Sequence, residues 1–162
     1  VEPALASALE ETHWPLEAYD TAEFEEWAAK LTPGAPPEEQ GIYEMWGARQ
    51  LELLKRGRSL PSSASVLIQA IKLGEGLRMS AIEGEPVAEH GLKMLSFYGE
   101  GVTFPLGYAN GEAMYLPVTR QLMEGGYEVE AYGEYGWPAR LAPGMERVVE
   151  ETLRSFIDKG ID

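Results

Sequence analysis

A strand, a tight turn, a helix and a second strand follow one another between Ala81 and Ala109, and this order constrains the fold more than any other feature. The turn is Gly84-Glu85-Pro86, and Pro86 suits the first turn of the helix. Strand–helix–strand units pack a helix on a sheet and bring the residues after each strand to one edge. We therefore expect an α/β fold with its functional side chains at that edge.

The rest of the chain divides into two predicted parts. Residues 1–60 are acidic, and their apolar residues recur at helical spacing on both sides of the breaker segment 32–37. We expect a helix capped by Asp20 in this part. Beyond residue 61, apolar runs predict strands over 66–73 and 77–82, joined by a hairpin turn at 74–76. The predicted architecture is a helical segment over 1–60 and an α/β domain over 61–162, with a small mixed sheet and flanking helices.

Two further elements belong to the predicted α/β domain. Residues 103–109 resemble a strand, and Pro105 favours an edge position because proline cannot donate to a neighbouring strand. After Pro143-Gly144, apolar residues recur at helical spacing up to Ile157. This pattern predicts an amphipathic helix packed on the sheet.

The composition excludes several classes of function. The formal net charge is −14, which disfavours binding to nucleic acid or to anionic membranes because both need a basic surface. There are no cysteines, so disulfides and cysteine-bound zinc are excluded. No apolar run reaches the roughly 20 residues of a membrane span, and no signal-peptide pattern is present. These features favour a soluble, cytoplasmic protein. The start at Val1-Glu2-Pro3, without methionine, indicates a piece of a longer polypeptide.

The two histidines are not expected to form a metal site by themselves. Nucleophile-elbow, phosphate-loop, HExxH and dinucleotide-binding motifs are all missing from the sequence. His13 precedes Trp14-Pro15 and is interpreted as a surface residue. His90 lies one helical turn after Pro86 and is interpreted as a solvent-facing helix residue.

Glu85 and Tyr115 are the candidate functional residues, and each has two interpretations. A glutamate between a strand and a helix is costly to bury unless it is paired or bound to metal, but it also suits a cap for the next helix. Tyr115 suits either a site or a core position in which its hydroxyl bonds a backbone carbonyl. Because the two residues follow neighbouring strands, they are able to converge on one point.

An ordered series of short motifs resembles the neutral/alkaline ceramidase family and its microbial relatives. The resemblance extends over about residues 40–160. Its main motifs are Gly84-Glu85, Gly107-Tyr108-Ala109-Asn110, Tyr115-Leu116-Pro117, Glu124-Gly125-Gly126-Tyr127-Glu128 and Arg140-Leu141-Ala142-Pro143-Gly144.

The resemblance implies a zinc-dependent hydrolase of amides of the sphingolipid type, and hence a role in lipid metabolism. By motif, Glu85 and Tyr115 correspond to zinc ligands, while Asn110, Tyr127 and Glu128 correspond to residues that order the surrounding loops. The family's two histidine ligands lie in an N-terminal region that this chain does not match. The expected partner is therefore the N-terminal domain of the same protein, and the chain alone is expected to bind zinc weakly and to be inactive.

A second interpretation assigns no catalysis to the chain. It is then an α/β module that binds a partner or assembles with itself, with Glu85 as a helix cap and Tyr115 in the core. The two interpretations differ in one geometric expectation. A metal site requires the carboxylate and the phenol to face one shared point.

Overall fold

The computed structural model describes residues 4–162 and confirms a mixed α/β fold. The expectation that the chain is a piece of a longer polypeptide rests on residues 1–3, which lie outside the described residues. The main sheet has the order β1-β2-β3-β5. Its strands are β1 (Ala6–Pro15), β2 (Ser63–Gly74), β3 (Leu77–Ile82) and β5 (Val102–Leu106). Neighbouring strands are antiparallel except β3 and β5, which are parallel.

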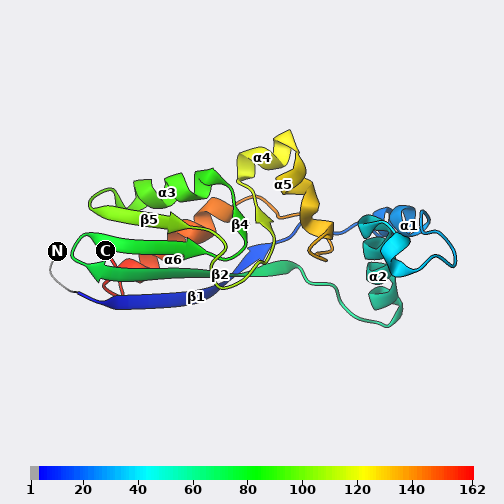
Figure 1. Cartoon of the computed structure of the whole chain (residues 1–162), viewed down its shortest axis with the longest axis horizontal. Coiled ribbons are helices and arrows are strands. Elements are labelled where there is room, and N and C mark those ends of the chain that lie inside the picture. Colours follow the sequence, from blue (N-terminus) through cyan, green and yellow to red (C-terminus); the bar gives the residue numbers. More distant parts are fainter. Residues whose placement is uncertain (1–3) are drawn as a thin grey trace.

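Two helices cover one face of this sheet. Helix α3 (Ala88–Tyr98) connects β3 to β5, and α6 (Met145–Ile157) lies behind the sheet in Figure 1. Alternate residues of β2 are buried on the helix side. They pack in one hydrophobic core with the apolar face of α6. The hairpin, the amphipathic helix and the edge position of Pro105 agree with the sequence analysis.

Strand β1 corrects the expectation that residues 1–60 form a helical segment. Its ten residues pair with β2 from Ala6 opposite Lys72 to Pro15 opposite Ser63. The physical reason is a period of two: Thr12 and Trp14 are buried, whereas Glu11, His13 and Pro15, which alternate with them, are exposed. Thr12 also donates to the carbonyl of Val66 at 2.6 Å. The N-terminal part is therefore integrated into the main sheet.

A helical pair follows β1. Helix α1 (Thr21–Ala28) begins at Asp20, whose carboxylate accepts a hydrogen bond from the backbone of Ala22, as predicted. A 3₁₀ turn, η1 (Pro37–Glu39), precedes helix α2 (Ile42–Lys55). The rings of Phe24 and Trp46 meet edge to face at 5.0 Å between the helices. In Figure 1 the pair extends from the right end of the molecule.

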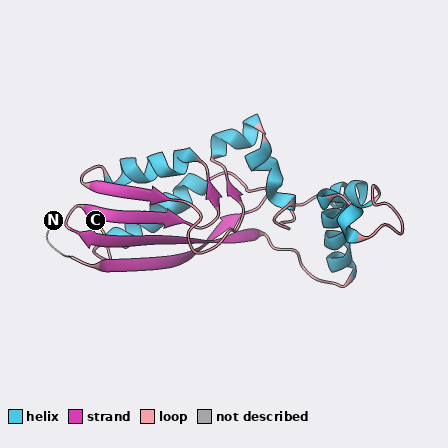
Figure 2. Cartoon of the chain, in the orientation of Figure 1, coloured by secondary structure: helices cyan, strands magenta, loops and turns pink. Residues whose placement is uncertain are grey.

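A second, two-stranded sheet continues from the carboxyl end of β3. It pairs β4 (Glu85–Pro86) with β6 (Tyr115–Leu116) in parallel. Three short helical elements follow: α4 (Thr119–Glu124), α5 (Tyr127–Glu130) and η2 (Ala131–Gly133). Figure 2 shows the two small strands beside the main sheet. None of the helices found in residues 4–162 is long and apolar enough to span a membrane.

Candidate functional site

A glycine turn places Glu85 against the loop that ends at Tyr115. Gly84 has φ +80°, a conformation that favours glycine, and a Cβ atom there would lie 2.6 Å from the carbonyl oxygen of Met114. The backbone N–H of Glu85 donates to that same carbonyl at 2.9 Å. The close approach of the two segments therefore depends on glycine at position 84.

The two candidate residues lie side by side. Glu85 and Tyr115 are direct partners in the parallel pairing of β4 with β6. The adjacent Glu85 carboxylate is the main cause that raises the pKa of Tyr115 to about 12. Because the two residues are direct partners, their side chains leave the small sheet on the same side. The hydrogen bonds to the carboxylate that the structure describes come from other tyrosines.

Two further tyrosines hold the carboxylate of Glu85. The Tyr108 hydroxyl donates to Oε2 and the Tyr135 hydroxyl donates to Oε1, each at 2.6 Å. Hydrogen bonds from Tyr108 and then Tyr135 hold the pKa of Glu85 below its ordinary value. Glu85 is thus an anion at neutral pH, with only 9% of its surface exposed. No role was predicted for either tyrosine from the sequence.

No basic side chain compensates this anion within residues 4–162. The salt bridges of the described residues do not include Glu85. Burying a carboxylate without a cation is costly, and hydrogen bonds from neutral phenols offset only part of that cost. The arrangement leaves unbalanced negative charge where three phenols converge.

Aromatic packing orders the same cluster. The ring of Tyr115 lies 5.3 Å from that of Tyr127 and 6.0 Å from that of Tyr135, in edge-to-face contacts. Tyr127 also donates its hydroxyl to Glu134 at 3.0 Å. It therefore supports Tyr115 through its ring and does not bond Glu85 directly.

The other two residues from the motif series contribute less. Asn110 has φ +69° and donates to the side chain of Gln69 on β2 at 3.3 Å, which ties the 107–114 loop to the main sheet. Glu128 lies half-buried in the first turn of α5. Among the described contacts, neither side chain bonds Glu85 or Tyr115.

Both histidines lie apart from Glu85, and the interpretation of His90 was wrong. Its side chain is fully buried, with the ring 5.6 Å from that of Trp14 and Nε2 3.1 Å from the carbonyl of Pro117. Burial lowers the pKa of His90. The interpretation failed because His90 lies on the side of α3 that packs against the core, next to Trp14 of β1. His13 is exposed on β1, as expected.

The donor set is incomplete for a protein-bound zinc ion. In the part of the chain that the structure describes, no three His, Cys, Asp or Glu side chains gather closely enough to hold a metal. Glu85 and Tyr115 together offer two oxygen ligands, whereas zinc takes about four. The capping alternative for Glu85 is also wrong, because Val87 precedes α3 and no side chain caps that helix.

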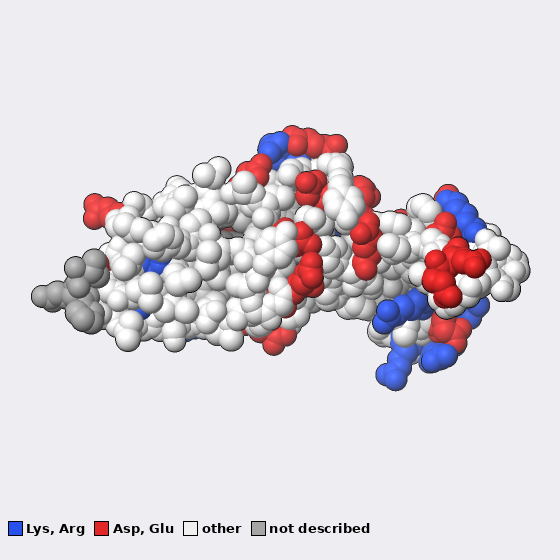
Figure 3. Space-filling model, viewed as in Figure 1, with Lys and Arg blue, Asp and Glu red and all other residues white. Residues whose placement is uncertain are grey.

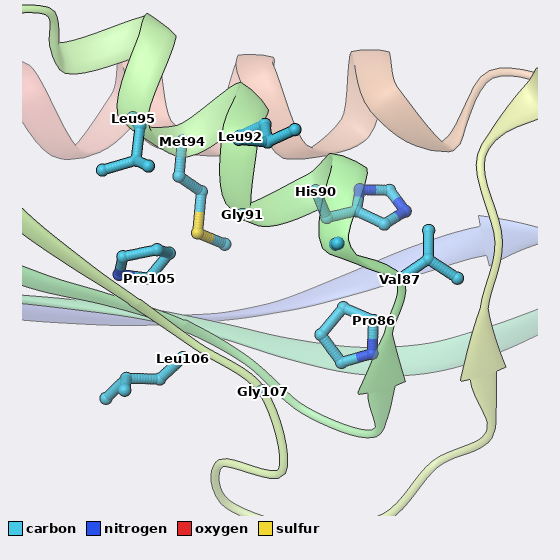
Figure 4. A pocket seen from close by; sticks show the side chains of 11 residues that line it. Pro86, Val87, His90, Gly91, Leu92, Met94, Leu95, Pro105, Leu106 and Gly107 are labelled. Atoms are coloured by element: carbon cyan, nitrogen blue, oxygen red, sulfur yellow. The ribbon is translucent and has the colours of Figure 1, made fainter.

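An apolar groove opens beside the cluster. It lies between α3 and β5, has a volume of about 360 Å³ and is lined without charged side chains. Figure 4 shows Met94 and Leu95 on the helix facing Pro105 across the groove. Pro86 and Gly107 line its end, and they adjoin Glu85 and Tyr108 in the sequence.

Comparison with known proteins finds no match: no family model, no curated protein and no solved structure is significantly similar to this chain.

Proposed function

We propose that the chain is part of a zinc-dependent amide hydrolase resembling the neutral ceramidases, in which Glu85 and Tyr115 are two of the metal ligands. One observation carries this proposal. Glu85 is an almost buried anion surrounded by phenols, and among residues 4–162 no basic side chain forms an ion pair with it. A cation bound at this point would balance its charge.

The residues of the chain have distinct tasks in this proposal. Glu85 supplies negative charge, and Tyr108 and Tyr135 orient its two oxygens. Tyr115 is protonated at neutral pH and gives up its proton when it binds the ion, as metal-binding groups do. A bound zinc ion would supply polarisation of an amide carbonyl and a water molecule of lowered pKa.

The remaining ligands come from elsewhere in the same protein. The sequence resemblance implies two imidazoles on an N-terminal domain, and His90 is unsuitable because it is buried away from Glu85. The proposed substrate is an amide that carries a hydrocarbon chain, as in sphingolipids. The uncharged groove beside Pro86 and Gly107 supports such a substrate.

Zinc analysis of the full-length gene product tests this assignment. We expect one zinc ion per protein, and loss of most of it in both Glu85→Gln and Tyr115→Phe. Tyr132→Phe is the matched control, because its hydroxyl bonds Glu23 and not Glu85. Equal zinc content in all four proteins would refute the ligand assignment. Hydrolysis of an N-acyl substrate by the 162-residue chain alone would refute the proposal that the metal ligands are divided between this chain and another part of the protein.

The second candidate is a non-catalytic module that binds a partner or assembles. One observation favours it: within residues 4–162, one face of the main sheet leaves the apolar side chains of Leu9, Val102 and Phe104 exposed, which is a common property of interaction surfaces. This candidate requires no zinc at Glu85. The same zinc analysis therefore separates the two functions.

A further inference from the structure

A cleft lies between α2 and the segment 133–136, with a volume of about 480 Å³. Ile42, Met45 and Trp46 of α2 line one side of it. Ile42 and Met45 are 56% and 37% exposed. Trp46 is buried, and its indole N–H donates to the carbonyl of Trp137 at 2.7 Å. The cleft, which we call the α2 cleft, therefore has an apolar wall that contains a fixed tryptophan.

Arg49 adds a positive charge to the same cleft. It follows Met45 by four positions, so the two side chains lie on one face of α2. Arg49 is exposed, and the ion pairs of residues 4–162 do not include it. Glu134 also lines the cleft, but its carboxylate accepts a hydrogen bond from the Tyr127 hydroxyl at 3.0 Å. The guanidinium of Arg49 is thus accessible to an anion from outside the chain.

Three more cations follow Arg49 toward the end of α2 and just beyond it. Lys55, Arg56 and Arg58 are all exposed. Within the part of the chain that the structure describes, only Arg56 of these three has an ionic partner, Glu52 at 2.8 Å. Together with Arg49 they form what we call the basic patch. Figure 3 shows Lys and Arg atoms gathered on the helical pair at the right end, while acidic atoms predominate over the rest of this face.

The position of Arg49 argues against a purely structural role of the basic patch. Cations stabilise the C-terminal end of a helix, but the effect falls off within the last turn. That role explains Lys55 and Arg56, because α2 ends at Lys55. Arg49 lies six residues before that end, so the helix dipole does not explain it.

The α2 cleft and the basic patch form one elongated surface. From Ile42 to Arg56 the helix rises about 1.5 Å per residue, which gives a length of about 21 Å. An extended chain of about six or seven residues covers this length. Apolar side chains lie at one end of the surface and cations at the other. The shape therefore suits a short peptide segment better than a compact small molecule.

We propose that the α2 cleft and the basic patch together bind an acidic segment of another protein, with one apolar side chain of that segment in the cleft. Charge complementarity decides the kind of partner, because carboxylates of the segment pair with Arg49 and with the cations that follow it. The apolar side chain displaces water from Ile42 and Met45 and supplies buried area. An anionic membrane suits the surface less well. These two side chains border a cleft, whereas binding to a bilayer requires an apolar helix face that lies flat in the headgroup region.

The proposed interface borders the candidate site. Tyr135 lines the α2 cleft, and its hydroxyl donates to Glu85 at 2.6 Å. A bound segment would therefore lie next to the residues that surround Glu85. The interface itself needs no zinc, because neither the cleft nor the patch includes a proposed metal ligand.

Titration calorimetry tests the proposal with a synthetic peptide that has one leucine followed by alternating glutamate and serine. We expect Arg49→Glu to weaken binding at least about fivefold, since it removes one ion pair and adds repulsion. Arg147→Glu is the matched control, because it makes the same charge change on α6, where the side chain is 78% exposed. It should change the affinity by less than about twofold. Replacing the leucine of the peptide by alanine should weaken binding about tenfold or more.

NMR of the methionine methyl groups shows where the peptide binds. The methyl signal of Met45 should shift during the titration. Met123 on α4 is the control, since it is 91% exposed and does not line the α2 cleft. Its methyl signal should stay in place.

Four results would overturn the proposal. The first is a peptide that gives neither heat nor a shift of the Met45 signal. The second is equal weakening by Arg49→Glu and Arg147→Glu, which would mean that the peptide responds only to overall charge. The third is binding to phosphatidylserine vesicles that Arg49→Glu abolishes, without binding of the peptide, which would identify a membrane as the partner. The fourth is growth of the particle mass with concentration in light scattering, abolished by Arg49→Glu, which would identify a second copy of the chain.

Discussion

Tyr135 donates a hydrogen bond of 2.6 Å to Glu85, although fifty positions separate the two residues in the sequence. The contact joins β4 to the segment after η2. That segment is itself held against α2, where Trp46 donates to the carbonyl of Trp137 at 2.7 Å. The helical pair thus helps to position a residue of the candidate site.

Removing the Tyr135 hydroxyl should destabilise the chain. We expect Tyr135→Phe to lower the free energy of unfolding by about 1.5–3 kcal/mol at pH 7, the usual range for a hydrogen bond to a charged group. Urea unfolding monitored by circular dichroism measures this value. Tyr127→Phe is the control, since its hydroxyl bonds the exposed Glu134, and it should change stability by about 0.5 kcal/mol or less. Equal effects of both variants would contradict the role of Tyr135.

Replacing Gly84 should disrupt the approach of the two site segments. An added Cβ atom would lie 2.6 Å from the Met114 carbonyl, and φ is +80°. Gly34 is a matched control, with φ +79° and open space around its Cβ position. We expect Gly34→Ala to cost about 1–2 kcal/mol through backbone strain alone, and Gly84→Ala to cost at least about twice that. Thermal unfolding of both variants checks the difference, and equal losses would show that the close contact is unimportant.

The burial of His90 predicts a loss of stability in mild acid. Burial lowers its pKa from the ordinary value of 6.5, and the hydrogen bond with the Pro117 carbonyl, followed by the charges of Glu146 and Glu89, opposes that shift. A group with a lowered folded-state pKa takes up its proton more readily in the unfolded state. Its contribution to stability is therefore complete above pH 6.5 and is lost as the pH falls through the folded-state pKa. NMR titration of the ring should show protonation below pH 6.5, and a midpoint above 6.5 would contradict the buried position.

Short sequence patterns predicted the elements whose formation depends mainly on neighbouring residues in the chain. The hairpin between β2 and β3 follows from Gly74 and Gly76, and α6 follows from apolar residues at helical spacing after Gly144. The pairing of Glu85 with Tyr115 was anticipated as convergence after neighbouring strands. The metal that this pair would bind stays a prediction.

Features that depend on distant contacts were not predictable in the same way. Strand β1 is acidic, and its partner Val66 lies 54 positions away from Thr12. The alternation of buried and exposed residues in β1 arises only when β1 pairs with β2. The burial of His90 depends on how α3 packs, and the hydrogen bond from Tyr135 depends on the path of the chain after η2. No short motif signals either contact.

A crystal structure of the full-length gene product, with anomalous scattering recorded at the zinc edge, tests the metal site at Glu85 most directly. We expect one zinc ion within about 2.0–2.2 Å of an oxygen of Glu85 and of the Tyr115 hydroxyl oxygen, with imidazoles from another part of the polypeptide completing the shell. A zinc ion bound elsewhere, or a Glu85 held only by Tyr108 and Tyr135 in a zinc-replete crystal, would contradict it.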